Sequence, residues 1–449
     1  MNGAQYSMQA DPLADDTMAA ILGPCGTAPD WHTIGIVNRQ FAQWQSNGAL
    51  AGWHAAADVP AQVAQPLEAF VRAATALPAW AGAAKIARAE ALFFDYGMLS
   101  CTLLFCSSLP ECYVIPDLAA VLHVAGQLEE HTDYRIRATA AMIFPVMMRG
   151  GLTGAGGTGL AQILKVRLIH ATIRYLILRG GPALADPRVV IAPLPAGGTS
   201  AGAPSMHQAL FAHGWNTGAD GLPCNQEELA YTLLTFGYVF LRSLRRLGLG
   251  LSASDEEAYL HTWNVMGHVL GIERSLMPAS MAQAGIMFAQ FQARGRLEPY
   301  VPDPRPALGR DLMQTMEAVI PLRMLRPFPV LLTRYLCGGA TARDLGIDQR
   351  VALSSRMLFA LLMIIARGID ALVRIVVPEF SLCRMVTRVV GYHFTVKVLL
   401  DQTRPLKLPT ALLNSVANMT QAWHSDPKAP GWVNALERRL TGRKKGMPT

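Results

Sequence analysis

Apolar residues recur every three or four positions along most of the chain after Pro60, which is the spacing of amphipathic α-helices. The stretch 83–96 (AAKIARAEALFFDY) is an example, because Ile86 and Phe93 share one stripe while Arg88 falls on another face. Alternation of apolar and polar positions, which is typical of a strand, is convincing only at 188–192. The pattern therefore predicts an all-α fold. Its further helices are expected over residues 98–108, 115–128, 132–149, 159–179, 225–247, 254–270 and 279–294, and over most of 309–400.

Two stretches interrupt the helical pattern. Residues 150–159 (GGLTGAGGTG) predict a glycine-rich turn between two helices, and residues 180–223 form a long insert rich in Gly, Ala and Pro. A connection of this length is more typical of a lid or a small subdomain than of a domain boundary. We therefore expect one helical domain over 61–350. An irregular segment with short helical pieces precedes it over 1–60, and a helical extension packed on the core follows over 351–449.

The composition narrows the class of protein. Of the 449 residues, 51% are hydrophobic and only 16% are charged, and the mean hydropathy is +0.24. This composition excludes a disordered chain, and it makes it necessary to ask whether any apolar run is long enough to span a membrane. A spanning helix needs roughly 18 to 20 consecutive apolar residues, whereas the longest apolar runs, 357–366 and 371–378, are shorter and are separated by Arg367 and Asp370. The apolar excess thus predicts a large buried interior or a deep pocket for an apolar group.

The charges and the cysteines indicate location and partners. The net charge is +7, and much of the excess lies in a C-terminal cluster that includes Arg438, Arg443 and Lys445. No aromatic residues interleave with basic ones there, so we expect no nucleic-acid partner, while contact with an anionic membrane surface is left open.

The first 16 residues lack the basic start and apolar stretch of a secretory signal, which indicates a cytoplasmic protein, free or peripheral at the membrane. The seven cysteines include no CxxC pair and are interpreted as buried free thiols.

Two glycine-containing motifs are set aside because of their surroundings. Residues 154–159 (GAGGTG) match GxGxxG, but a dinucleotide fingerprint follows a strand, and the preceding segment here is helical. Residues 198–202 match GxSxG, but Pro195 and Pro204 bracket them where a nucleophile elbow needs a strand and a helix. The sequence contains no HExxH motif and no pair of ExxH motifs, which removes zincin and ferritin-like di-iron sites.

The remaining chemical candidate is a helix with a histidine between two arginines. Arg167, His170 and Arg174 are three and four residues apart, so they project from one side of a helix whose other residues are largely Val, Leu and Ile. Two nearby guanidinium groups disfavour a protonated imidazole, and a neutral imidazole is the form that binds a metal or haem iron. The arginines would also suit carboxylates such as haem propionates. On the spacing alone, a histidine with a purely structural role is the favoured interpretation.

Several segments resemble the family of latex-clearing rubber oxygenases and the fungal mycophenolic-acid-pathway oxygenase. They occur in the same order and cover about residues 75–350. The paired signature VRxxHAxxR and NQExLxxT is the most specific part of the resemblance. The resemblance implies an all-α, globin-like helical core that encloses a haem b, and an enzyme that cleaves carbon–carbon double bonds of isoprenoid chains with dioxygen. The segments are PAWAGAAKIARAEALFFDYG (78–97), SSLPECY (107–113), YRIRATA (134–140), KVRLIHATIRYLI (165–177), LPCNQEELAYTLLTFG (222–237), SASDEEAYLHTWNVMGHVLGIERSLMP (252–278) and TRYLCGGATARDLGI (333–347).

The resemblance assigns roles to individual residues. His170 corresponds to the proximal ligand of the haem iron, and Arg167 and Arg174 match arginines beside it, which we interpret as contacts to the cofactor. Arg135 and Thr139 match an arginine and a threonine of the distal pocket, where a cation and a hydroxyl would stabilise bound dioxygen or a developing oxyanion. A segment that begins with Asn225 and Gln226 corresponds to one that caps and lines a neighbouring helix.

The chain also departs from the family pattern. Some rubber oxygenases place a lysine ligand just before the distal threonine, where this sequence has Ala138, so the far side of the iron is expected to be open. The helix over 115–127 contains Asp117 but no glutamate that would match the family's catalytic one.

Two functions follow from these observations. The first is a haem b oxygenase that uses dioxygen or peroxide on a lipophilic, isoprenoid or unsaturated small molecule, with oxidative cleavage of a double bond as one outcome. The second is a non-catalytic, membrane-associated helical protein that carries a haem or a lipid.

Overall fold

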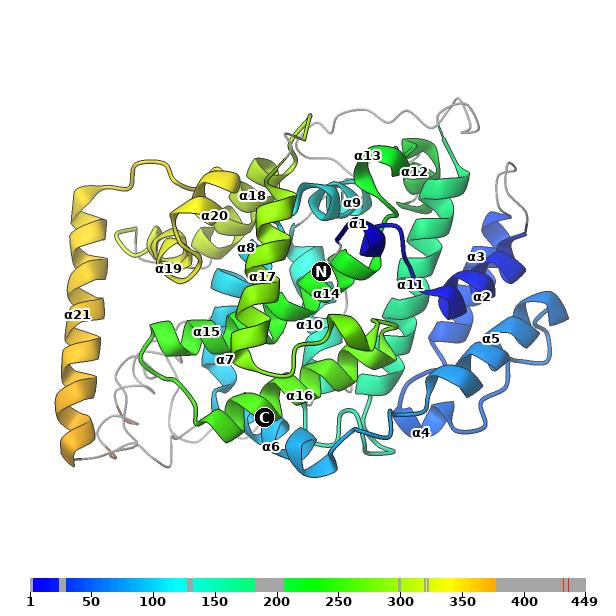
Figure 1. The fold of residues 1–449 in the computed structure, drawn as a ribbon, viewed down its shortest axis with the longest axis horizontal. Coiled ribbons are helices and arrows are strands. Elements are labelled where there is room, and N and C mark those ends of the chain that lie inside the picture. The colour runs from blue at the N-terminus through cyan, green and yellow to red at the C-terminus, as the bar shows by residue number, and fades with distance from the viewer. Residues whose placement is uncertain are drawn as a thin grey trace.

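The computed structural model describes residues 3–23, 30–126, 132–181, 206–297, 300–318, 320 and 323–376, together with the single positions 431 and 435. Within these residues every regular element is a helix and no strand occurs, which confirms the all-α prediction (Figure 1). The predicted strand at 188–192 lies outside the described residues.

The long helix α11 (Gly159–Arg179) lies at the centre of the packing (Figure 1). It packs against α10 (Thr132–Met147), α2 (Pro12–Leu22) and α12 (Met206–His213), and it also touches α16 (Ala253–Val269). Its buried residues lie on several sides of the helix, from Leu160 to Ile177. A helix that is apolar on more than one face is an interior helix, because each face needs a packing partner. The packing of α11 along its whole length therefore depends on neighbours that come from distant parts of the sequence.

The N-terminal segment is more regular than predicted. Residues 1–60 were expected to be irregular, but they contain α1 (Gly3–Tyr6), α2, α3 (Trp31–Phe41) and α4 (Asn47–Leu50). Helix α2 begins at the cap residue Asp11, with a proline at its first position, and buries one side against α11. Its buried side combines the small residues Ala14 and Thr17 with Met18, Ile21 and Leu22, and the apolar stripe is short because the helix has only 11 residues.

Two of the predicted helices are interrupted in the structure. The helix expected over 98–108 begins as α7 (Gly97–Leu103), widens into a π-helical turn, η1 (Leu104–Ser108), and continues as α8 (Leu109–Cys112). The helix expected over 225–247 breaks into α14 (Gln226–Phe236) and α15 (Tyr238–Arg246). Gly237 lies at this break, and a Cβ there would stand 3.2 Å from Trp263 Cγ. The bend thus allows a close approach of α16.

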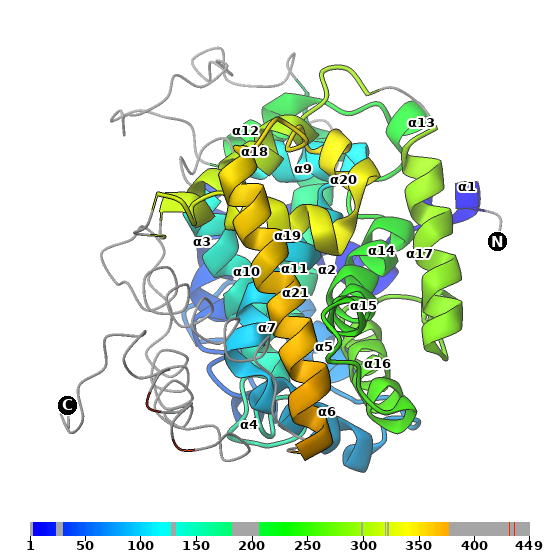
Figure 2. The ribbon, with the colours of Figure 1, turned by 90° about the vertical axis from the view of Figure 1, so that its left-hand side faces the viewer.

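The other helices surround this centre. Helices α6 and α16 lie side by side, as do α14 and α17, and α19 packs on η1 and on α20 (Figures 1 and 2). The remaining elements are α5 (Ala61–Ala74), α6 (Ala83–Asp95), α9 (Pro116–Gly126), α13 (Thr217–Asp220), η2 (Arg274–Leu276), α17 (Met281–Gly295), α18 (Arg305–Ala318), α19 (Phe328–Cys337), α20 (Gly339–Asp344) and α21 (Leu353–Val376).

The glycine-rich turn at 150–159 joins α10 to α11 by close backbone packing. The Asn47 side chain donates to the carbonyl oxygens of Gly151 and Gly154 at 2.8 and 2.9 Å. A Cβ on Gly157 would lie 2.1 Å from the Gly150 carbonyl oxygen, so no larger residue fits there. The glycines of the GxGxxG match therefore have a structural role in a tight turn that Asn47 of α4 holds in place.

The insert and the C-terminal extension are described in part. Of the insert at 180–223, residues 206–213 and 217–220 form the helices α12 and α13. Helix α21 stands at the edge of the molecule (Figures 1 and 2) and exposes apolar side chains such as Met357 and Ile364. Of the described helices, none is by itself long and apolar enough to cross a bilayer, and Ala83–Asp95 with Leu99–Cys112 meets that test only as a pair bent by 89°.

We expect the contact between α6 and α10 to be a major source of stability. Phe144 is 1% exposed and packs edge-to-face on Phe93, with ring centroids 5.5 Å apart. Phe144→Ala should lower the free energy of unfolding by about 3–5 kcal/mol, because it leaves a cavity in a closely packed region. Urea denaturation would measure this change, with Ile286→Ala, at a side chain 61% exposed, as a control that should stay within about 0.5 kcal/mol.

Candidate functional site

His170 lies in the middle of α11 with one ring nitrogen unsatisfied. Its Nδ1 is buried and finds no hydrogen-bond partner in the part of the chain that the structure describes. The pKa of His170 is lowered to about 4, chiefly by burial and also by the nearby positive charge of Arg174, while Asp11 opposes the shift. The imidazole is therefore neutral near pH 7, which leaves a nitrogen lone pair available for a metal.

The surroundings of His170 on α11 are apolar and incompletely covered. Val166 and Ile173, one turn before and after it, are half-buried, and Ile169 is 39% exposed. Elsewhere on the same helix, residues such as Leu164 and Leu168 are fully buried. This face is thus the one part of the middle of α11 that keeps apolar side chains accessible, and it is the face that bears the histidine.

Arg167 is held by a buried ion pair with α2. Its guanidinium donates to the two carboxylate oxygens of Asp11 at 2.5 and 2.8 Å and to the Val269 carbonyl oxygen at 3.0 Å. The side chains of Arg167 and Asp11 are only 10% and 5% exposed. Gly271 has a left-handed φ of 92°, and a Cβ there would come within 2.4 Å of an Asp11 carboxylate oxygen. The glycine thus leaves room for the pair.

Arg174 makes a second pair with the same helix. It donates to the Asp15 carboxylate, with 2.6 Å from Nη2, and to the carbonyl oxygens of Pro223 and Cys224 at 3.1 and 2.7 Å. In this structure both arginines bond to protein acceptors and dock α2 on α11. Each guanidinium keeps at least one further N–H donor, so the predicted contact with the cofactor stays a prediction.

The segment that begins with Asn225 has the structural role that the sequence predicted. Asn225 caps α14 by accepting from the Glu228 backbone N–H at 2.9 Å. Gln226 donates to the carbonyl oxygens of Ala10 and Gly271 at 2.7 and 2.8 Å. These bonds tie α14 to the start of α2, next to the Asp11–Arg167 pair.

The predicted distal residues lie on α10, which packs against α11. Thr139 is half-buried, and Arg135 lies four residues before it on the same helix. The side chain of Arg135 is outside the described part, as is that of Ala138. The structure therefore brings the helices of Thr139 and His170 together and leaves the position of the Arg135 guanidinium undescribed.

The residues around His170 fit a haem better than a bare metal ion. Among the described residues, no group of three or more His, Cys, Asp or Glu side chains is arranged to hold a metal ion. A bare ion needs several protein ligands, whereas a haem brings four nitrogen ligands of its own and needs one axial ligand from the protein. A single buried, neutral and unpaired imidazole in apolar surroundings meets that need.

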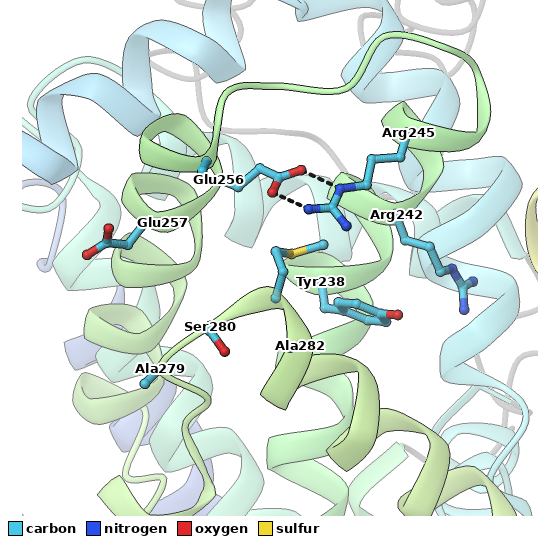
Figure 3. A pocket seen from close by; sticks show the side chains of 10 residues that line it. Tyr238, Arg242, Arg245, Glu256, Glu257, Ala279, Ser280 and Ala282 are labelled. Carbon is cyan, nitrogen blue, oxygen red and sulfur yellow. Dashed lines mark hydrogen bonds and ion pairs between the residues drawn. The ribbon is translucent and has the colours of Figure 1, made fainter.

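Two cavities of about 500 Å³ in the described part lie away from His170. One is lined by Tyr238, Arg242, Arg245 and Glu256 and by residues 279–282 (Figure 3). Its arginines already have acidic partners: Arg245 pairs with Glu256, as Figure 3 shows, and Arg242 pairs with Glu111. This cavity therefore presents satisfied charges to solvent and contains none of the predicted site residues.

Comparisons with known proteins agree on one family. The family model described as "ER-bound oxygenase mpaB/B'/Rubber oxygenase, catalytic domain" matches residues 112–368. A rubber oxygenase from Streptomyces sp. (strain K30) is 21% identical over 346 residues, which cover 76% of this chain and 72% of the relative. A solved structure of latex clearing protein in the closed state is similar in fold, with a TM-score of 0.58 and 19% identity over 93% of this chain and 90% of that one.

We expect the Asp11–Arg167 pair to be essential for stability. Asp11→Asn keeps the size and the capping ability of the side chain but leaves the buried guanidinium without a counter-charge. The free energy of unfolding should fall by about 3–5 kcal/mol, which urea denaturation would measure. Asp16→Asn changes an exposed residue of the same helix and should have an effect within about 0.5 kcal/mol. Equal effects of the two substitutions would contradict this assignment.

Proposed function

Because the chain belongs to the ER-bound oxygenase mpaB/B' and rubber oxygenase family, we propose that it is a haem b-dependent oxygenase that uses dioxygen or peroxide. Its substrate is a lipophilic small molecule with an isoprenoid or otherwise unsaturated chain, and oxidative cleavage of a double bond is the reaction that we test first. The likeness to a rubber oxygenase supports this substrate class.

The unpaired Nδ1 of His170 carries this proposal. A buried polar atom without a partner is costly, by about 1–3 kcal/mol, and persists where a ligand uses it. His170 would hold the haem iron, with a ring that burial keeps neutral. When bound, the haem supplies the iron that activates the oxidant.

The chain's own residues bind the substrate and keep water away. The apolar side chains of Val166, Ile169 and Ile173 beside His170 suit a hydrocarbon chain, which they would orient by contact alone. A site without water also strengthens any charge interaction within it. Thr139 and Arg135, from α10, would provide a hydroxyl and a cation to an oxygen atom that gains negative charge.

The ion pairs of Arg167 and Arg174 position the ligand. His170 lies between the two arginines along α11, and each arginine holds that helix to α2. These contacts fix the position of α11 along its own axis and its rotation about that axis. They therefore also fix the direction of the imidazole, and they do so without any contact to the substrate.

Replacement of His170 tests the proposal first. After expression with haem supplied, the wild-type protein should show a Soret band, and His170→Ala should lose most of it, because the substitution removes the proposed ligand of the iron. His32→Ala, at an exposed histidine, should keep the band. A wild-type protein without a Soret band would contradict the haem assignment, and a band of unchanged position and intensity in His170→Ala would contradict the ligand.

The distal residues should affect turnover more than cofactor content. Thr139→Val and Arg135→Leu are expected to retain the Soret band and to lower kcat by about tenfold or more, because they remove groups that act on the oxygen species. Product analysis by mass spectrometry after incubation with isoprenoid and unsaturated fatty substrates would measure this. Haem binding with no product from any such substrate would favour the carrier function instead.

A further inference from the structure

A second cavity, of about 530 Å³, lies between four helices, and His170 does not line it. Its walls come from the starts of α9 and α14, from α13 and from the end of α17, which lie close together in the upper part of Figure 1. Its apolar lining includes Met8, Ile115 and Phe291. None of the residues assigned to the oxygenase site lines it.

The polar lining of this cavity is acidic. Asp117 comes from α9, Asp220 from α13, and Glu227 and Glu228 from α14. The one basic residue of the lining, Arg294, forms an ion pair with Glu227. Asp117, Asp220 and Glu228 have no ion pair within the described residues. Three carboxyl groups thus face the cavity without a counter-charge of their own.

The buried carboxylate of Glu228 has one oxygen without a hydrogen-bond partner. Its side chain is 2% exposed, and its Oε1 accepts from the Asn225 side chain at 3.1 Å. Its Oε2 is buried and has no hydrogen-bond partner among the described residues. The cap of α14 therefore accounts for one carboxylate oxygen of Glu228 and leaves the other without a partner, at a residue that lines the cavity.

We propose that this cavity binds a small organic cation with N–H donors, such as a primary ammonium group, between Glu228 Oε2 and the carboxylate of Asp117, with its hydrocarbon part against Met8, Ile115 and Phe291. An acceptor oxygen without a partner calls for a donor, which distinguishes a primary ammonium from a quaternary one. A metal ion fits less well, because the described residues contain no metal-holding group of three acidic, His or Cys side chains. The apolar wall also matches a hydrocarbon tail.

Binding is linked to the release of a proton. Burial raises the pKa of Glu228 well above its usual value, and Asp117 raises it further, while the backbone of Cys224 and Asn225 and the charge of Arg174 lower it. Burial also raises the pKa of Asp117 to about 6, with Asp220 adding to the rise and Arg294 opposing it. Without a cation, these two carboxyl groups therefore hold a proton to a larger extent than exposed carboxyl groups do at the same pH. The bound ammonium favours the ionised form, so affinity increases as the pH rises from 6 to 8.

Isothermal titration calorimetry of the full chain with n-butylammonium tests the proposal. We expect saturable binding that is stronger at pH 8 than at pH 6, and a proton release that appears as a buffer-dependent heat. Glu228→Gln keeps the acceptor for Asn225 but cannot ionise, so it should weaken binding at least about tenfold and abolish the proton release. Asp117→Asn should also weaken binding. Tetramethylammonium, which has no N–H, should bind at least about tenfold more weakly than n-butylammonium.

Glu90→Gln is the matched control. Glu90 is 5% exposed, accepts from the Gly150 backbone N–H at 2.9 Å and also has one unpaired buried oxygen, but it lines neither of the two cavities described above. This variant should bind n-butylammonium with unchanged affinity, and thermal denaturation would verify that all variants are folded. The proposal is overturned by a failure of n-butylammonium to bind at pH 8, by equal binding to the wild type and Glu228→Gln, or by a preference for Ca²⁺ over the ammonium.

Discussion

Two buried arginine–aspartate pairs between α2 and α11 are the constraint on which the rest of the structure depends. The guanidinium groups of Arg167 and Arg174 lie in the interior of the helix bundle. An unpaired charge there would lower the stability of the fold by several kcal/mol. Asp11 and Asp15 compensate them, and both lie at the start of α2, 156 and 159 residues earlier in the chain. The central helix therefore cannot be fully assembled without the N-terminal segment. The direction of the His170 ring depends on the same contacts.

Much of the fold could be predicted because helical periodicity is a local signal. The boundaries of α6, α10, α11 and α16 lie close to the predicted ones, since each has a long apolar pattern. Helix α2 was missed because it has only 11 residues and its buried side mixes Ala14 and Thr17 with Met18, Ile21 and Leu22. The break at Gly237 was missed because it depends on the distant helix α16, and the π-helical turn at Leu104–Ser108 was also not predicted. Tertiary contacts of this kind leave no local pattern.

The candidate site was predictable only in part. The spacing of Arg167, His170 and Arg174 placed them on one helix, and the family resemblance gave His170 a role. The partners of the arginines could not be predicted, because nothing in the sequence near Asp11 and Asp15 specifies which cations they meet. The structure adds these interactions with the protein, while the predicted contacts with haem propionates stay a prediction.

The unsatisfied nitrogen of His170 couples the cofactor to the folding equilibrium. A ligand that binds only the native state stabilises it by RT ln(1 + [L]/Kd), about 2.7 kcal/mol when its concentration is a hundred times Kd. Under the proposed function, the chain without haem bears the full penalty of a buried polar atom, and the chain with haem is relieved of it. The amount of folded protein in a cell would then follow the supply of haem as well as the rate of synthesis, so scarcity of the cofactor would remove the protein along with its activity.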